Sequence, residues 1–227
     1  MKQNIKVSKS NYLVRAAYRL TMQEQRLVLA CLSKIDSRKG IVTVKLSAQD
    51  YATTFGIDLK NAHREMYDAA DRLWDRSVIV SDPNQTEKVR WIQSQIKTNT
   101  GDGEIELMFS DRMSKYICDL AGTYTSYLLR NVSCLKSVYS IRLFELLMSW
   151  QKTGHLTIPL EDFREYLQLQ DKYKAFKALN SRIITPCVKE LNEKTGFRIE
   201  LVTRKKGKTV THLMFDFKEE EQLTMPF

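Results

Sequence analysis

The sequence predicts an α+β fold made of two similar units in series, and three observations predict it. Residues 42–57 and 155–169 align at a constant offset of 112, with apolar residues at matching positions. Each of these segments follows a stretch with the apolar spacing of an amphipathic helix. Each copy also ends in two alternating strands closed by a turn. A helix-turn-helix backed by a β-hairpin is a winged helix, so the sequence predicts two tandem winged-helix domains.

The helices that open the copies are expected at 22–35 and 137–150. A short strand follows each, and the aligned segment then starts another helix. In the first copy Ser47 and Asp50 have the spacing of a capping box, and in the second Pro159 suits the first helical position. Both copies are therefore expected to begin this helix at the same point.

A longer helix and a two-strand ribbon complete each copy. The helices are expected at 61–77 and 172–194, and the ribbons at 89–110 and 197–217. Gly207 supplies the backbone freedom that a tight hairpin turn favours. Each copy then holds about 100 residues, enough for a small core.

The boundary between the copies is expected near 120–126. This gives an N-terminal domain of residues 1–121 and a C-terminal domain of residues 122–227. The length of the chain fits one large core or two small ones, so the repeat decides in favour of two. Limited proteolysis is expected to cut at this junction or at no internal site.

Composition restricts the class of protein. The net charge is +9 at pH 7, which favours nucleic acid as a partner but also fits a cationic protein that binds at a membrane surface. The 4 cysteines are far apart and form no C-x-x-C pair, as is typical of buried thiols in a reducing compartment. No segment has the length of a signal peptide or a membrane span. We therefore expect a cytoplasmic protein with no membrane partner.

The helix expected at 172–194 is the candidate reading element of the second copy. Its basic and polar residues share one face, beside an apolar stripe. The second helix of a winged-helix pair enters the major groove, so this face is expected to reach double-stranded DNA; a solvated face is the alternative. The Asn180 amide could pair with adenine, or it could cap or pack. The candidate residues are Lys174, Lys177, Asn180, Ser181 and Arg182.

The tip of the second ribbon carries four cations that folding does not require. They are either a solvated loop or a contact with phosphates, and in a winged helix the ribbon reaches the backbone beside the groove. The tip of the first ribbon carries Asp102 and Glu104 instead, so the two ribbons cannot do the same work. The four cations are Arg204, Lys205, Lys206 and Lys208.

The helix expected at 61–77 is a weaker candidate for DNA contact. Its first turn carries basic and polar residues, but Asp68, Asp71 and Asp75 follow. The first turn can approach DNA if the acidic part of the helix points away. The candidates here are Lys60, Asn61 and Arg64.

The sequence gives little support for a catalytic site. His63, His155 and His212 are isolated, so the paired histidines that hold the metal of a DNA-nicking initiator are missing. The chain has no glycine-rich phosphate loop for an ATPase. We expect no cofactor, no metal and no enzymatic activity. A nicking rolling-circle initiator is the alternative of another class.

Five segments together resemble the replication initiator (Rep) proteins of iteron-containing plasmids of the F-plasmid type. They are NYLVRAAYRLTMQEQRLVLACLSKI, LSAQDYATTFGI, SVYSIRLFELLMSW, RIITPCVKELNEKTGFRIEL and RKKGKTVTHLMFDF. They cover nearly the whole chain, in order and with compatible spacing. Arg182 matches an arginine of the recognition helix in that family. Pro186 should remove the backbone bond to Arg182 and bend the helix, but family members can carry proline there.

The resemblance implies a function as well as a fold. In that family two winged-helix domains bind repeated sites (iterons) at a plasmid origin as a monomer, and a homodimer formed through the N-terminal domain represses the initiator's own gene. The family also loads the host replication initiator and helicase. A plain tandem winged-helix transcriptional repressor would share every DNA contact and differ only in what it recruits.

Overall fold

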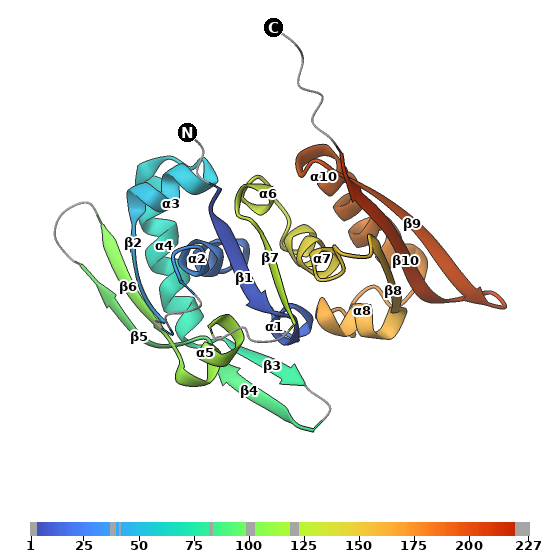
Figure 1. Cartoon of the computed structure of the whole chain (residues 1–227), viewed down its shortest axis with the longest axis horizontal. Helices are drawn as coiled ribbons and strands as arrows, with labels where there is room; N and C mark the ends of the chain where they lie inside the picture. Colours follow the sequence, from blue (N-terminus) through green and yellow to red (C-terminus); the bar gives the residue numbers. More distant parts are fainter. Residues whose placement is uncertain are drawn as a thin grey trace, which may run out of the picture. The chain divides into compact units, whose positions relative to one another are not determined.

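The chain divides into two units between Ser133 and Cys134 (Figure 1). The computed structural model describes residues 4–36, 40, 42–81, 84–98, 103–118 and 123–220. The division falls after the boundary at 121/122 that the sequence predicts. The reason is that β7 (Tyr124–Leu128) pairs antiparallel with β1 (Lys6–Ser10), so residues 124–133 belong to the first unit. Residues 119–122, part of the expected junction, lie outside the described residues.

The first unit contains the expected helix, strand, helix, helix and ribbon in that order, with additional elements around them. Its elements are β1 (Lys6–Ser10), α1 (Asn11–Arg15), α2 (Met22–Leu32), β2 (Thr43–Ser47), α3 (Ala48–Phe55), α4 (Leu59–Trp74), β3 (Ser77–Ser81), β4 (Thr86–Arg90), β5 (Ile92–Lys97), β6 (Glu104–Phe109), α5 (Asp111–Ile117), β7 (Tyr124–Leu128) and α6 (Arg130–Ser133).

The second unit repeats the same order with fewer additions. Its elements are α7 (Val138–Met148), β8 (His155–Pro159), α8 (Leu160–Tyr166), α9 (Phe176–Leu179), a π-helical turn η1 (Asn180–Ile184), α10 (Thr185–Lys194), β9 (Phe197–Lys206) and β10 (Thr209–Glu219).

The two units share one sheet topology, which confirms the repeat. The three-stranded sheets have the orders β2-β6-β5 and β8-β10-β9, so in each the strand before the helix pair joins the last strand of the ribbon. In Figure 1 α2, α3 and α4 lie against one face of the first three-stranded sheet, and α7, α8 and α10 against one face of the second. The sequence of helix pair and β-hairpin is that of a winged helix in both units.

The helix after the first strand begins at the same point in both copies, as predicted, but the two starts differ in chemistry. Ser47 caps α3 by accepting a hydrogen bond from the Asp50 backbone N–H at 3.1 Å. In the second copy Pro159 occupies the cap position and the helix begins at Leu160, so the prediction that Pro159 is the first helical residue is wrong. A proline ring has no group that can accept a capping bond.

The first ribbon was predicted too early in the chain. Val89 and Arg90 belong to β4, which pairs with β3 in a hairpin that has no counterpart among the described residues of the second unit. The chain then bends at the fully buried Trp91 into β5, the true first strand of the ribbon. The helix α4 ends at Trp74 rather than at 77, because β3 already begins at Ser77.

A charge cluster lies inside the first unit, between α2 and the end of α4. The Glu24 side chain is 0% exposed and accepts hydrogen bonds from Arg72 Nε at 3.2 Å and from Arg76 Nε at 3.1 Å. It also completes a capping box by accepting from the Thr21 backbone N–H. Buried carboxylates persist in proteins when they are paired in this way. The cluster fixes α4 against α2.

No helix in the described part of the chain has the length and apolar character needed to cross a bilayer.

Candidate nucleic-acid interface

The candidate reading helix of the second unit is a composite of α9, η1 and α10. Thr185 donates its backbone N–H to Asn180, five residues back, and Pro186 has no N–H to give. The wide turn η1 accommodates the missing donor, so the proline lies within the first turn of α10 instead of ending the helix. The helical stretch runs from Phe176 to Lys194, whereas the sequence predicted a start at 172.

One face of this composite helix is exposed and carries three of the predicted residues, Lys177, Ser181 and Arg182. The opposite face is buried in the unit by Leu179, Ile183, Ile184, Cys187 and Leu191. Burial raises the pKa of the Cys187 thiol to about 11, so that group is uncharged at neutral pH. The helix is therefore held by an apolar face and presents a polar one.

Asn180 and Arg182 lie at two different hollows of the second unit. Asn180 is half-buried and lines a hollow of about 570 Å³ that reaches Leu201 of β9. Arg182 lines a separate hollow of about 360 Å³ beside the start of α7. Neither Arg182 nor Lys177 has a carboxylate within 4.0 Å among the described residues. Both cations are therefore available to an anionic ligand.

Lys174 does not belong to the helix, and this predicted placement is wrong. It lies two residues before Phe176, where α9 begins. The cap residue of α9 is Ala175, whose side chain makes no capping hydrogen bond. The carbonyl of Lys174 instead accepts a hydrogen bond from Arg164 Nη2 at 3.0 Å. Lys174 is exposed and lines a groove with residues of the wing rather than a helical face with Arg182.

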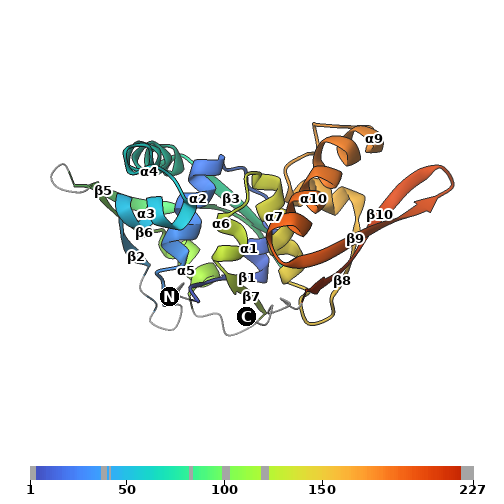
Figure 2. The same ribbon diagram turned by 90° about the horizontal axis from the view of Figure 1, so that it is seen from above.

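The ribbon of the second unit, strands β9 and β10, ends in the four predicted cations. Its turn consists of Gly207 and Lys208, and Gly207 has a φ of 62°, which residues with a Cβ rarely adopt. Figure 2 shows the ribbon extending beyond α10 to this tip. All four cations are exposed, and none forms an ion pair within the described residues; they are Arg204, Lys205, Lys206 and Lys208.

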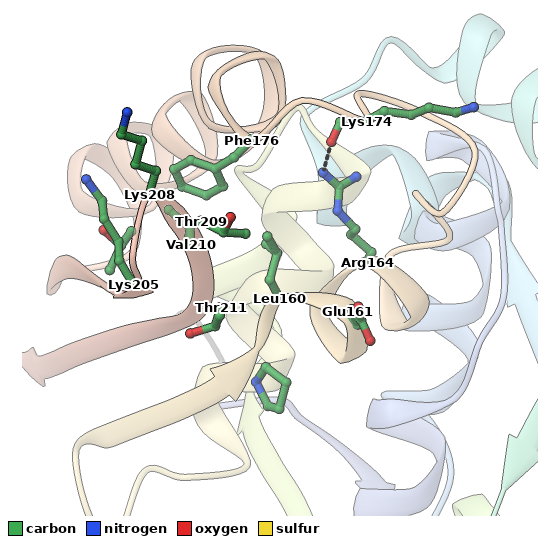
Figure 3. Close-up of a pocket in the computed structure, with 12 residues that line it drawn as sticks. Leu160, Glu161, Arg164, Lys174, Phe176, Lys205, Lys208, Thr209, Val210 and Thr211 are labelled. Carbon is green, nitrogen blue, oxygen red and sulfur yellow. Dashed lines mark hydrogen bonds between the residues drawn. The ribbon is translucent and has the colours of Figure 1, made fainter.

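A groove of about 870 Å³ lies between the ribbon, the start of α8 and the turn before α9. Its lining is mixed, with the apolar residues Leu160, Phe176 and Val210, the carboxylate of Glu161 and several basic and hydroxyl side chains. In Figure 3 Lys205 and Lys208 lie on one side of Phe176 and Lys174 on the other, with the Lys174 ammonium pointing away from the wing. The groove thus has Lys205 and Lys208 on one side and Lys174, with its ammonium directed outward, on the other.

The first unit places its candidates at the exposed start of α4. Asp58 caps this helix by accepting from the Lys60 backbone N–H at 3.0 Å. Arg64 donates to the Asn61 side chain at 3.3 Å, and Lys60 is exposed. These residues lie together at one helix end, as predicted.

The acidic residues of α4 lie further along the same helix. Asp68, Asp71 and Asp75 are exposed, and Asp71 is neutralised by Lys97 of β5 at 2.6 Å. The tip of the first ribbon, with Asp102, lies outside the described residues.

The three histidines occupy ordinary structural positions. The His63 ring packs on Tyr67 with centroids 4.3 Å apart, and His155 Nδ1 lies 2.7 Å from Asp216 Oδ1. His212 is half-buried in β10. Across the described ranges no three His, Cys, Asp or Glu side chains are grouped as metal ligands.

Sequence reasoning missed Arg164, which organises the turn before the reading helix. Its guanidinium donates four hydrogen bonds, to the carbonyl oxygens of Leu169 at 3.4 Å, Lys172 at 3.0 Å, Tyr173 at 2.9 Å and Lys174 at 3.0 Å. A lone arginine in an amphipathic helix carries no pattern that would distinguish this role from an ordinary surface charge.

Two family models match the chain. One, described as Initiator Replication protein, WH1, matches residues 6–148, and the other, Initiator Rep protein, WH2, matches residues 159–217. A curated Replication initiation protein of Escherichia coli is 28% identical over 232 residues, covering 96% of this chain and 71% of that protein.

Solved structures resemble the chain as well. A crystal structure of Pi initiator protein in complex with iteron DNA has a TM-score of 0.83 at 20% identity, covering 98% of this chain and 100% of that one. A crystal structure of domains 2 and 3 of RctB has a TM-score of 0.51 at 10% identity, covering 87% and 81%. At these identities the likeness establishes the fold, and with the family models it confirms two winged-helix domains.

Proposed function

Because the chain belongs to the initiator replication protein family, we propose that it binds double-stranded DNA at repeated origin sites and starts plasmid replication there. The observation that carries this proposal is the set of exposed cations without carboxylate partners on the reading helix and ribbon of the second unit. Cations arranged in this way on a winged helix suit a groove and its flanking phosphates. The DNA-bound Pi initiator protein, whose fold the chain shares, supports the same assignment.

The division of work follows from the side chains. Lys177, Ser181 and Arg182 of the reading helix enter the major groove, with Asn180 at its edge. The ribbon cations contact the backbone beside it. Lys60, Asn61 and Arg64 at the start of α4 provide a second contact from the first unit. This role is one of binding and recruitment in the cytoplasm, and it needs no catalytic group or cofactor.

Footprinting tests the proposal on the DNA next to the gene. Two reading helices in successive major grooves are separated by about one helical turn, ~34–36 Å, so one monomer should protect about 20 base pairs. Protection of tandem direct repeats is expected. Protection of a single inverted repeat alone would instead identify a transcriptional repressor, and metal-dependent strand cleavage would identify a nicking enzyme.

The finer part of the proposal is a change of oligomeric state. We propose that the monomer binds the repeats and that a homodimer, formed through the first unit, represses the chain's own gene. The family membership motivates this, as it does the recruitment of the host replication initiator and helicase. Sedimentation of the protein free and on one repeat should show a dimer and a monomer. The same dimer on both site types would contradict the switch.

Replacing Lys205 and Lys206 by alanine should weaken binding to all DNA sequences alike. Each phosphate contact contributes about 0.9 to the slope of log K against log salt, so the double variant should lower that slope by up to about 1.8. Discrimination between the natural repeat and a mutated repeat should stay unchanged, because phosphates carry no sequence information. An unchanged slope would show that the cations of the ribbon tip are only solvated.

A further inference from the structure

The helix pairs of the two units are joined by turns of different length. In the first unit α3 ends at Phe55, Gly56 adopts a left-handed φ of 63°, and Asp58 already caps α4. In the second unit Gln168 lies at the position of Gly56 and has a φ of 53°. After Leu169, which matches Ile57, the six residues 170–175 precede α9, where the first unit has Asp58 alone. We call residues 170–175 the turn insertion.

The turn insertion lacks the local devices that fix the first turn. It contains no glycine, yet Tyr173 has a φ of 53°, which is unfavourable for a residue with a Cβ. Its last residue, Ala175, cannot accept a capping bond at the start of α9. Something outside the segment must therefore hold it.

Arg164 of α8 supplies that restraint. Three of its four acceptors are carbonyls of the turn insertion, those of Lys172, Tyr173 and Lys174, at 2.9–3.0 Å. A guanidinium presents its donors in a rigid planar fork, so one side chain fixes several backbone groups at once. Figure 3 shows Arg164 below the turn, directed at the Lys174 carbonyl while the Lys174 side chain extends outward.

The turn insertion carries two cations to the surface. Lys172 and Lys174 are exposed, and neither forms an ion pair within the described residues. Lys174 also lines the groove that Lys205 and Lys208 flank from the ribbon. Its ammonium points away from the ribbon (Figure 3), so it extends the exposed basic surface beyond the groove, as suits the phosphates of a DNA backbone.

We propose that the turn insertion is a DNA-backbone contact of the second unit, made by Lys172 and Lys174, and that Arg164 is its positioning residue. This proposal rests on the function proposed above. Arg164 acts through the backbone of residues 169–174, because both of its terminal nitrogens, Nη1 and Nη2, donate to carbonyls there.

The test is the salt dependence of binding to a random-sequence duplex of about 30 base pairs, which reports phosphate contacts without requiring the natural site. Lys172→Gln with Lys174→Gln should lower the slope of log K against log salt by up to about 1.8. Arg164→Lys keeps the charge but loses the fork, and it should lower the slope similarly. The variant that combines all three substitutions should show no larger decrease in slope than the two lysine substitutions alone. Amide hydrogen exchange at residues 169–175 should become faster in Arg164→Lys.

Arg198→Lys is the matched control, because Arg198 is an exposed arginine of β9 whose partner is Glu200 at 3.1 Å. It should leave the slope unchanged. A wild-type slope in Arg164→Lys, or a loss in the triple variant equal to the sum of its parts, would overturn the positioning role. A wild-type slope in the lysine pair would overturn the contact itself. If the wild-type chain binds no duplex at all, the proposed function fails, and that result is distinct from both.

Discussion

Replacing Arg72 and Arg76 together by methionine should lower the free energy of unfolding by about 3–5 kcal/mol. The change leaves the Glu24 carboxylate, whose side chain is 0% exposed, without either of its cationic partners. A buried charge that has lost its partner retains the cost of desolvation and gains nothing in return. Urea unfolding followed by circular dichroism measures the effect.

Adding Glu24→Gln to this double variant is the decisive control. It removes the buried charge, so most of the lost stability should return. Glu24→Gln alone should cost less than the arginine pair, because the side chains of Arg72 and Arg76 are 40% exposed and can be hydrated. Arg198→Met, which removes an exposed pair with Glu200, should cost less than about 1 kcal/mol. If the triple variant is no more stable than the double, the cluster stabilises by packing and not by charge.

Replacing Arg182 by alanine should weaken binding to the natural repeat by about 1–3 kcal/mol, a loss of roughly 5-fold to 150-fold in Kd. Arg182 is exposed on the polar face of the reading helix and has no carboxylate partner within the described residues. An arginine that contacts a base edge contributes discrimination at that base as well as affinity. Kd should be measured at one salt concentration on the repeat and on each of its single-base variants.

The pattern of losses identifies the kind of contact. The Arg182→Ala variant should become indifferent to the base at one position and keep its preferences elsewhere. Arg198→Ala removes an equal charge from the start of β9 and should leave the preferences intact. A uniform loss on all variants, with a lower salt slope, would assign Arg182 to a phosphate instead.

The repeat could be predicted because apolar spacing is set by burial on one face. Strands β2 and β8 are each buried at their second and fourth residues, and the residues that follow start α3 and α8 at the same offset. The buried positions of both strands are apolar in the sequence, so the pattern can be recognised without the structure. The four cations of the ribbon tip could also be predicted, because the glycine of the turn and the basic residues around it lie in one short stretch of sequence.

The elements that were missed depend on contacts between distant residues. The β3–β4 hairpin has no equivalent in residues 134–220, the described part of the second unit, so a comparison of the copies could not reveal it. Lys174 has helical spacing from Lys177, but the helix starts after it. The positive φ of Tyr173, the extended backbone of Ala175 and the bond from Arg164, ten residues earlier, show this only in the structure. The division between the units falls at Ser133 and Cys134, after the expected 121/122, because β7 pairs with β1 at the other end of the first unit.

The pairing of β1 with β7 also governs how the first unit forms during synthesis. Lys6 leaves the ribosome early, whereas its partner Leu128 is made only after nearly all of the unit. Val7 and Leu13, both 0% exposed in the folded protein, cannot be fully buried until that strand has been made. Closing so long a loop costs entropy before its contacts stabilise the chain. A nascent chain that ends before β7 therefore exposes an unpaired strand edge and apolar surface, the features that chaperones shield.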